Sequence, residues 1–322
     1  MYDIISIGDA TLDTFIQIDD ATLSCELNKE NCLMCLSYGK KIPIHNFERT
    51  VAGEAANNAV ASSRLGLQAA FWTILGQDET GQMVIDEMTK EGVATKYVEI
   101  LKGSKSNFSI VLNFKGERTQ LIYRYPREYK LPKLDQTKWL YLTALSKEHI
   151  LVNQPIIDYV TKNKVNLAYN PGSEQISCML PGCHKLFKYT KILFANKEEA
   201  QAILGDEEKD IKKLLLGLHN LGPEIPVITD GMNGSYAYQD GKYYFIAAYP
   251  ANLVEQTGAG DSYAAAFTAA TFYNEKIPEA MRWGAINSAS VVEKVGPQAG
   301  LLKLADLKAK LGKNPEFQAK EI

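Results

Sequence analysis

The chain has 322 residues, of which 38 are acidic and 35 basic, giving a net charge of −3 at pH 7. This length exceeds that of a typical domain, but one large α/β sheet with an appendage reaches it. Without a basic excess the chain lacks the electrostatic signature of nucleic-acid binding. No apolar run approaches the roughly 18 residues that span a bilayer, and the first residues lack a signal peptide's basic region, so we expect neither a membrane segment nor a secretory signal.

The five cysteines are sparse and odd in number, which favours a reducing cytoplasm. Cys32 and Cys35 form a C-x-x-C pair downstream of Cys25. With His45 as a fourth ligand, these thiolates would hold zinc or an iron–sulfur cluster. The alternative interpretation is that they are small apolar side chains on a pair of strands, and the absence of a second close cysteine pair favours it.

Short apolar segments alternate along the chain with longer helical segments, which is typical of helices covering both faces of a mostly parallel sheet. The expected strands cover residues 1–8, 70–75, 139–143, 165–169, 192–194 and 227–229. The expected helices cover residues 57–65, 196–204, 208–218, 261–273 and 278–295. The pattern predicts a three-layer α/β fold.

Two segments, 15–48 and 105–126, break this rhythm. Residues 108–114 and 118–123 alternate apolar and polar side chains around a glycine-containing turn, which predicts antiparallel hairpins. We expect both segments to form a small β-sheet lid that closes over a site. Residues 1–14, 49–104 and 127–322 would then form the large nucleotide- and substrate-binding unit.

The segment 255–261, Glu-Gln-Thr-Gly-Ala-Gly-Asp, precedes an alanine-rich helical stretch. Gly258 and Gly260 let backbone amides approach a ligand closely, and amides at a helix start attract an anion. Asp261 stands beside them as an acceptor for a hydroxyl proton, so the segment indicates phosphoryl transfer to an alcohol. The alternative is an ordinary strand-to-helix connection with Asp261 as its N-cap.

Seven motifs in order together resemble the ribokinase-like (PfkB) carbohydrate kinases over nearly the whole chain. They are Gly8 with Asp13, Ala52–Gly53 with Asn57, and the segments 75–81, 170–172, 196–199, 229–234 and 257–261. The resemblance implies a ribokinase-like three-layer α/β/α fold with a β lid. It also implies ATP-dependent phosphorylation of a hydroxyl.

The resemblance further implies roles for individual residues. Asp261 would be the general base, and the amides of Gly258, Ala259 and Gly260 would form the anion hole. Glu199 would hold Mg²⁺ through water, since this ion keeps much of its hydration. Asp13, Gly53 and Asn57 would bind the acceptor, with Asp13 at the carboxyl end of the first strand or, alternatively, only capping a turn. The nucleotide would contact Asn196, Thr229, Gly231, Gly234, Thr257, Gly258, Gly260 and Asn287.

The chain departs from the family pattern at two acidic residues. Glu255 stands where many members have an Asp that helps to form a monovalent-cation site, which puts activation by potassium in doubt. Glu54 stands where ribokinases commonly have Lys, and its carboxylate repels an anionic acceptor. We therefore expect a neutral sugar rather than a sugar phosphate.

Arg124 and Arg127 end the second lid segment. A guanidinium entering the pocket would pair with the carboxylate of a sugar acid, but we favour the interpretation that both are solvated charges at the lid edge. Phe108, Tyr123 and Tyr125 would instead stack a nucleobase, and nucleoside kinases share this fold.

The sequence thus predicts an MgATP-dependent kinase for a small, non-phosphorylated sugar that is ribose-like, fructose-like or a sugar acid. The alternatives are a nucleoside kinase and a non-catalytic relative that binds sugar or nucleotide. The resemblance also implies a homodimer that forms through the lid, and the cysteine count favours the cytoplasm.

Overall fold

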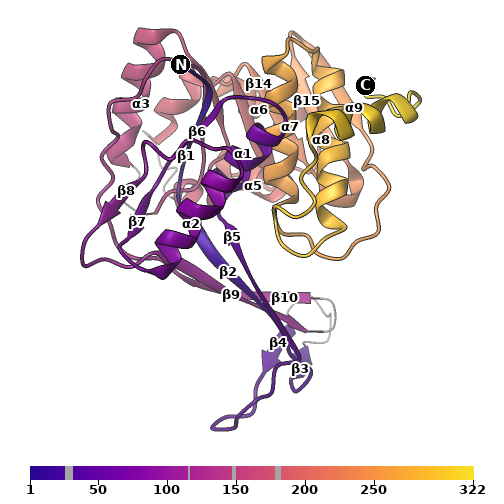
Figure 1. Cartoon of the computed structure of the whole chain (residues 1–322). Helices are drawn as coiled ribbons and strands as arrows, with labels where there is room; N and C mark the ends of the chain where they lie inside the picture. Colours follow the sequence, from indigo (N-terminus) through magenta and orange to yellow (C-terminus); the bar gives the residue numbers. More distant parts are fainter. Residues whose placement is uncertain (26–31, 115–116, 147–149, 178–182) are drawn as a thin grey trace.

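The computed structural model describes residues 1–25, 32–114, 117–146, 150–177 and 183–322. Within these residues the main sheet has nine strands in the order β17-β16-β15-β14-β13-β12-β11-β1-β6 (Figure 1). The strands from β14 to β6 run parallel, and β15, β16 and β17 are antiparallel. Their bounds are β1 Tyr2–Ile7, β6 Ala69–Trp72, β11 Thr137–Leu142, β12 Asn166–Tyr169, β13 Ile192–Asn196, β14 Ile225–Thr229, β15 Ser235–Gln239, β16 Lys242–Ile246 and β17 Lys320–Glu321.

Helices cover both faces of this sheet, because successive apolar side chains of each parallel strand point to opposite sides. In β1, for example, Ile4 belongs to one hydrophobic cluster and Ile5 and Ile7 to the other. The first cluster lies under α1 (Glu54–Arg64), α2 (Glu79–Lys90), α7 (Ala259–Phe272), α8 (Ile277–Val292) and α9 (Leu304–Lys313). The second lies under α3 (Ile150–Asn163), α5 (Lys197–Leu204) and α6 (Ile211–Asn220). The three-layer fold is therefore confirmed.

The expected strand at residues 70–75 is wrong in one respect. It is divided between β6, which pairs with β1, and β7 (Ile74–Gly76), which pairs with β8 (Glu99–Leu101) in a separate two-stranded sheet. An uninterrupted apolar run carries no signal for a change of partner strand, so it resembles a single buried strand.

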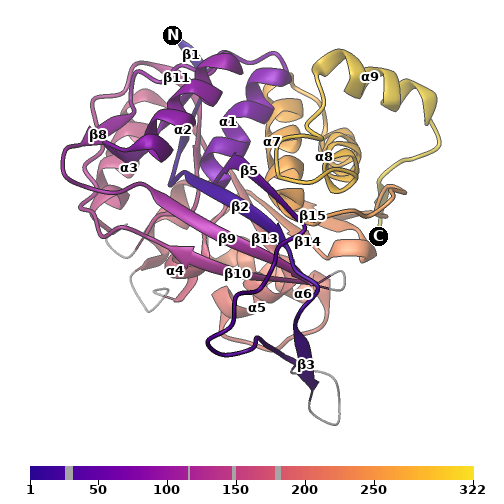
Figure 2. The same cartoon turned by 60° about the horizontal axis from the view of Figure 1, so that its bottom comes forward.

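A four-stranded sheet forms the lid beneath the main sheet, in the order β10-β9-β2-β5 (Figure 2). Its bounds are β2 Thr11–Gln17, β5 Asn46–Ala52, β9 Asn107–Phe114 and β10 Glu117–Tyr123. The β9–β10 and β2–β5 pairs are antiparallel, whereas β2 and β9 pair in parallel and so join the two lid segments. The turn expected at residues 115–116 lies outside the described residues.

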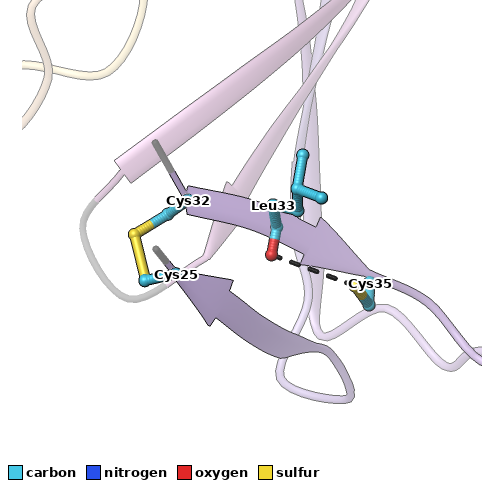
Figure 3. Close-up of a disulfide and its surroundings, with 4 residues drawn as sticks. All are labelled: Cys25, Cys32, Leu33 and Cys35. Carbon is cyan, nitrogen blue, oxygen red and sulfur yellow. Dashed lines mark hydrogen bonds between the residues drawn. A yellow bond between two sulfur atoms is a disulfide. The ribbon is translucent and has the colours of Figure 1, made fainter. Parts of the chain in front are cut away.

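The hairpin of β3 (Thr22–Cys25) and β4 (Cys32–Cys35) extends from the lid sheet, and a disulfide joins Cys25 to Cys32 (Figure 3). His45 is paired with Asp19 at 2.9 Å. The interpretation of these cysteines as metal ligands is therefore wrong, because two of the three sulfurs bond each other. Nor does the described part of the chain contain another group of three or more His, Cys, Asp or Glu side chains arranged for a metal.

A disulfide persists in an oxidising compartment, whereas the cysteine count favoured a reducing one. These two observations point in opposite directions, and the cytoplasmic location stays a prediction. None of the helices in the described ranges is both long enough and apolar enough to cross a bilayer.

Candidate active site

A cavity of about 400 Å³ lies between the lid sheet and the carboxyl ends of the parallel strands. It collects residues from the loop after β1, from all four lid strands, and from the starts of α1, α5 and α7. A slightly larger cavity, about 450 Å³, lies at the opposite edge of the sheet, near residues 136–139 and 163–166. Its described lining contains no carboxylate, whereas five carboxylates line the first cavity, namely those of Asp9, Asp13, Glu54, Glu199 and Asp261.

Asp261 and Asn57 meet in this cavity although they are 204 residues apart. The Asn57 amide nitrogen donates a hydrogen bond of 2.7 Å to Asp261 Oδ2. Gln298 Nε2 donates to Asn57 Oδ1 at 3.1 Å, which fixes the direction of the amide. We expected Asn57 to bind the acceptor and Asp261 to take its proton, and the structure brings both side chains together.

Burial, together with the neighbouring carboxylates of Glu54 and Glu199, raises the pKa of Asp261 to about 7, against the Asn57 hydrogen bond that lowers it. Burial likewise raises the pKa of Glu199 to about 7. The pKa of Glu54 is also raised by burial. Carboxyl groups with shifted pKa values in one cavity are typical of a catalytic or ion-binding site.

Two glycines are required by the backbone around the cavity. Gly53, the N-cap of α1, has φ 97°, and a Cβ there would lie 2.6 Å from the Asp9 carbonyl oxygen. Gly258, the N-cap of α7, has φ 81°, and a Cβ there would lie 2.5 Å from Pro297 Cβ. A Cβ on Gly260 would meet no heavy atom within 4 Å, so open space adjoins this part of the loop. The Ala259 amide donates to the Gln256 carbonyl at 3.2 Å.

Asp13 lies inside lid strand β2, not at the end of β1 as the sequence analysis expected. It is 3% exposed, and its Oδ1 accepts a hydrogen bond of 2.6 Å from the Ser109 hydroxyl. Gln120 Nε2 in turn donates to Ser109 Oγ at 3.0 Å. Asp13 still lines the cavity, but it enters from the lid.

Asp9 is the acidic residue that lies directly beyond β1, and the sequence analysis missed it. Its carboxylate accepts hydrogen bonds from the Tyr129 hydroxyl at 2.8 Å and the Ser146 hydroxyl at 2.9 Å, and it lines the cavity. Burial raises its pKa. The rule that ligands bind beyond the carboxyl ends of parallel strands identifies Asp9 once β1 is known to end at Ile7.

The lid residues that line the cavity are mostly polar, whereas Phe108 and Tyr123 lie on the opposite face of the lid sheet. Every second residue of β10 and its extension lines the cavity, namely Arg118, Gln120, Ile122 and Arg124. Phe108 and Tyr123 fall in the alternate register, opposite each other on β9 and β10, with ring centroids 5.3 Å apart. No aromatic residue is among the described residues that line this cavity.

Of the two arginines that end the lid, only Arg124 reaches the cavity. Arg127 is 6% exposed, and its guanidinium donates to the carbonyl oxygens of Ile74, Lys105 and Tyr125. The interpretation of Arg127 as a solvated charge is therefore wrong, because it holds together three backbone segments at the root of the lid.

The residues expected to bind nucleotide lie partly outside this cavity. Asn196 caps α5 in a reciprocal pair with Glu199, each side chain accepting from the other's backbone amide at 2.8 Å. Thr229 is the register partner of Asn196 on β14, and Gly231 and Gly234 follow it at the same edge of the sheet.

Asn287 is fully buried. It donates to the Ser262 carbonyl at 2.9 Å and accepts from the Leu302 amide at 3.0 Å. The structure does not bring it to the cavity.

The model of the pfkB family of carbohydrate kinases matches residues 15–304, so the chain belongs to that family. Ribokinase from Haemophilus influenzae is 24% identical over 280 residues, covering 82% of this chain and 88% of that one. The 5-dehydro-2-deoxygluconokinase of Halalkalibacterium halodurans is 27% identical over 291 residues, covering 83% and 87%. The structure of Arabidopsis thaliana ribokinase complexed with ribose and ATP aligns with a TM-score of 0.79 at 20% identity, over 96% and 98% of the two chains.

This membership confirms the recognised family and makes the chain a phosphotransferase with an alcohol acceptor, not the non-catalytic relative considered as an alternative. Kinases of this family use ATP as the phosphoryl donor.

Proposed function

We propose that this protein transfers the γ-phosphate of MgATP to a hydroxyl of a small, non-phosphorylated sugar, with Asp261 as the general base. The observation that carries the proposal is the 2.7 Å hydrogen bond between Asn57 and Asp261 in a cavity shared by both parts of the molecule. One carboxylate oxygen is fixed by the amide, and the other is left to accept a hydroxyl proton.

The proposed step is a direct displacement. A hydroxyl oxygen of the sugar forms a bond to the γ-phosphorus while the bond from that phosphorus to the leaving oxygen of ADP breaks. The hydroxyl proton passes to Asp261, and the products are a sugar phosphate and ADP. The backbone amides of Gly258 and Gly260 would face the charge on the transferred group, whereas the Ala259 amide is engaged by the Gln256 carbonyl.

The carboxylates in the cavity fit a divalent cation. Glu199 uses one oxygen to cap its own helix, which leaves the other oxygen for a metal-bound water. The raised pKa values of Glu199 and Asp261 arise from burial and from nearby carboxylates, and a divalent cation would lower both. When bound, Mg²⁺ would neutralise charge on the phosphates.

The charges in the cavity favour an uncharged polyol over a phosphorylated acceptor. Glu54 is held by the Thr143 hydroxyl and the Ala144 amide, and it faces the same space as Asp9 and Asp13. Arg124 lines the cavity and its charge acts on both Asp9 and Glu54. A sugar acid, the acceptor class of the deoxygluconokinase relative, would use Arg124 to pair its carboxylate.

A nucleoside acceptor has less support. Its base would be expected to stack on an aromatic side chain, and the described cavity lining has none of the aromatic residues expected to supply one. Phe108 and Tyr123 pack on each other in the alternate register of the lid sheet.

A screen of acceptors tests the substrate class. Purified protein with MgATP would be given pentoses, hexoses, sugar acids and nucleosides, and ADP release measured. We expect turnover with a sugar or sugar acid, and turnover confined to nucleosides would contradict the proposal.

Replacing Arg124 with Gln would raise the KM for a sugar acid at least about tenfold and leave the KM for a neutral sugar nearly unchanged.

Asp261→Asn tests the base. The amide keeps the shape of the side chain but cannot accept the proton, so we expect kcat to fall by about 10²- to 10⁴-fold while ATP binding, measured by calorimetry, is retained. Asp306→Asn, on the exposed side of α9, is the matched control and should leave kcat unchanged. Turnover by Asp261→Asn at the unmodified rate would eliminate the mechanism.

A further inference from the structure

An ion pair joins the lid to the loop that precedes α7. Arg118 Nη1, on lid strand β10, lies 2.8 Å from Glu255 Oε1, 137 residues further along the chain. The same nitrogen contacts the Thr257 hydroxyl. Both Arg118 and Thr257 line the cavity, next to the turn whose amides would face the transferred phosphate.

The negative charge of Glu255 would repel a nearby phosphate unless a cation neutralises it. Its side chain is 7% exposed, and Oε1 also accepts from the Thr257 amide at 2.7 Å. Its Oε2 is buried, and in the described part of the chain this atom has no hydrogen-bond partner. A buried carboxylate needs a cation or several donors to offset its loss of hydration. Arg118 supplies a full positive charge to one oxygen and leaves the second oxygen for another guanidinium nitrogen.

We propose that Arg118 is a positioning residue for phosphoryl transfer. Lid strand β10 places its positively charged guanidinium beside Glu255. Its guanidinium neutralises Glu255 and fixes Thr257, so the Gly258–Gly260 turn is set for the phosphate only while the lid strand lies over the site. This inference rests on the proposed kinase function. It also explains how Glu255 is tolerated beside an anion hole without an inorganic monovalent cation.

The first test uses cation dependence. The unmodified protein should turn over at the same rate in potassium, sodium and a large organic cation. Arg118→Gln should lose about 10- to 100-fold in kcat, with a smaller change in KM for the sugar, because the turn is misplaced and Glu255 is left unpaired. Methylguanidinium or potassium at millimolar concentration should restore part of this loss, and Arg118→Lys should be intermediate. A purely structural role would show no such rescue.

A matched control is available on the same sheet. Arg49 on β5 pairs with Glu79 at 3.5 Å and is 37% exposed, against 42% for Arg118, but it does not line the cavity. Arg49→Gln should keep its kcat and its indifference to cations. Equal losses in both variants would show that lid charges act nonspecifically.

A double-mutant cycle tests the pairing itself. Glu255→Gln removes the charge that Arg118 offsets, so Arg118→Gln should cost at least about fivefold less in that background than alone. Additive effects would contradict the inference, as would an Arg118→Gln variant with unaltered kcat or strong potassium activation of the unmodified protein.

Hydrogen exchange separates this inference from the proposed function. If no acceptor is phosphorylated, the kinase proposal fails. The Arg118–Glu255 ion pair still predicts faster amide exchange in β10 for Arg118→Gln and not for Arg49→Gln. Unchanged exchange in β10 would overturn the proposed role of this ion pair even in an active enzyme.

Discussion

At the scale of single residues, the cavity holds Asp261, the proposed general base, in an environment that opposes its ionisation. Burial and the carboxylates of Glu54 and Glu199 raise the pKa of Asp261 to about 7, and the Asn57 amide is the one hydrogen bond that counteracts them. A base with a pKa near the working pH is both ionised in part and strong enough to take a proton. In the proposed mechanism Asn57 would therefore lower the pKa of Asp261 as well as orient its carboxylate.

Replacing Asn57 with Ala should expose this tuning. The lost hydrogen bond stabilises the carboxylate form, so the pKa of Asp261 should rise further and the ascending limb of the pH–rate profile should move to higher pH. We expect a fall in kcat of about 10- to 100-fold at pH 7 that is partly recovered at pH 9.

Asn58→Ala is the matched control for this change. Asn58 is the next residue of α1, is equally buried and accepts from the Ser6 hydroxyl at 2.7 Å, away from Asp261. Asn58→Ala should lower the free energy of unfolding without moving the ascending limb of the pH–rate profile. A profile of Asn57→Ala that keeps its unmodified midpoint would contradict the assigned role.

At the scale of elements, the site is built where helices begin. The start of α1 and the start of α7 converge, each after a glycine with positive φ, so that the first turn of each helix presents its side chains to one cavity. Small residues make this approach possible, since α7 is buried from Ser262 to Ala270 against its neighbours. The motif around Gly53 and the motif around Gly258 are therefore adjacent in space.

Gly53→Ala should be strongly destabilising. It forces a side chain into a positive-φ conformation and places Cβ 2.6 Å from the Asp9 carbonyl oxygen, so we expect a loss of roughly 2 to 4 kcal/mol in the free energy of unfolding. Gly103→Ala has φ 73° but open space around it, and should lose only about 1 kcal/mol. Denaturant titration measures both, and equal losses would show that the contact with Asp9 contributes nothing.

At the scale of the whole molecule, the lid sheet exposes apolar side chains on its edge strands. Phe47 on β5 and Leu121 on β10 are exposed, and these are the two edge strands of the sheet. Exposed edge strands with apolar residues favour pairing with another chain. This supports the homodimer that the sequence analysis expected.

Sedimentation analysis tests the dimer. The unmodified protein should sediment as a dimer at micromolar concentration, and Leu121→Asp should shift it to a monomer. Leu216→Asp, an equally drastic change at an exposed position of α6, should have no effect. A monomeric unmodified protein would refute a lid dimer.

The sequence by itself determined the fold class, because hydrophobic periodicity and glycine position are local properties. Strands β1, β11, β12, β13 and β14 lie where the pattern predicted, as do α1, α5, α6, α7 and α8, whereas α2, α3 and α9 were not predicted. Seven ordered motifs then identified the family, which the family match confirms. Contacts between distant segments have no such local signal.

Only the tertiary structure decided which strand carries Asp13, that Asp9 occupies the end of β1, and that Asn57 bonds to Asp261. It also decided the partner of Glu255, because Arg118 reaches it only through the parallel pairing of β2 with β9 and the hairpin to β10. Such pairings depend on register and packing across the whole molecule, since each strand can satisfy its backbone hydrogen bonds with several partners.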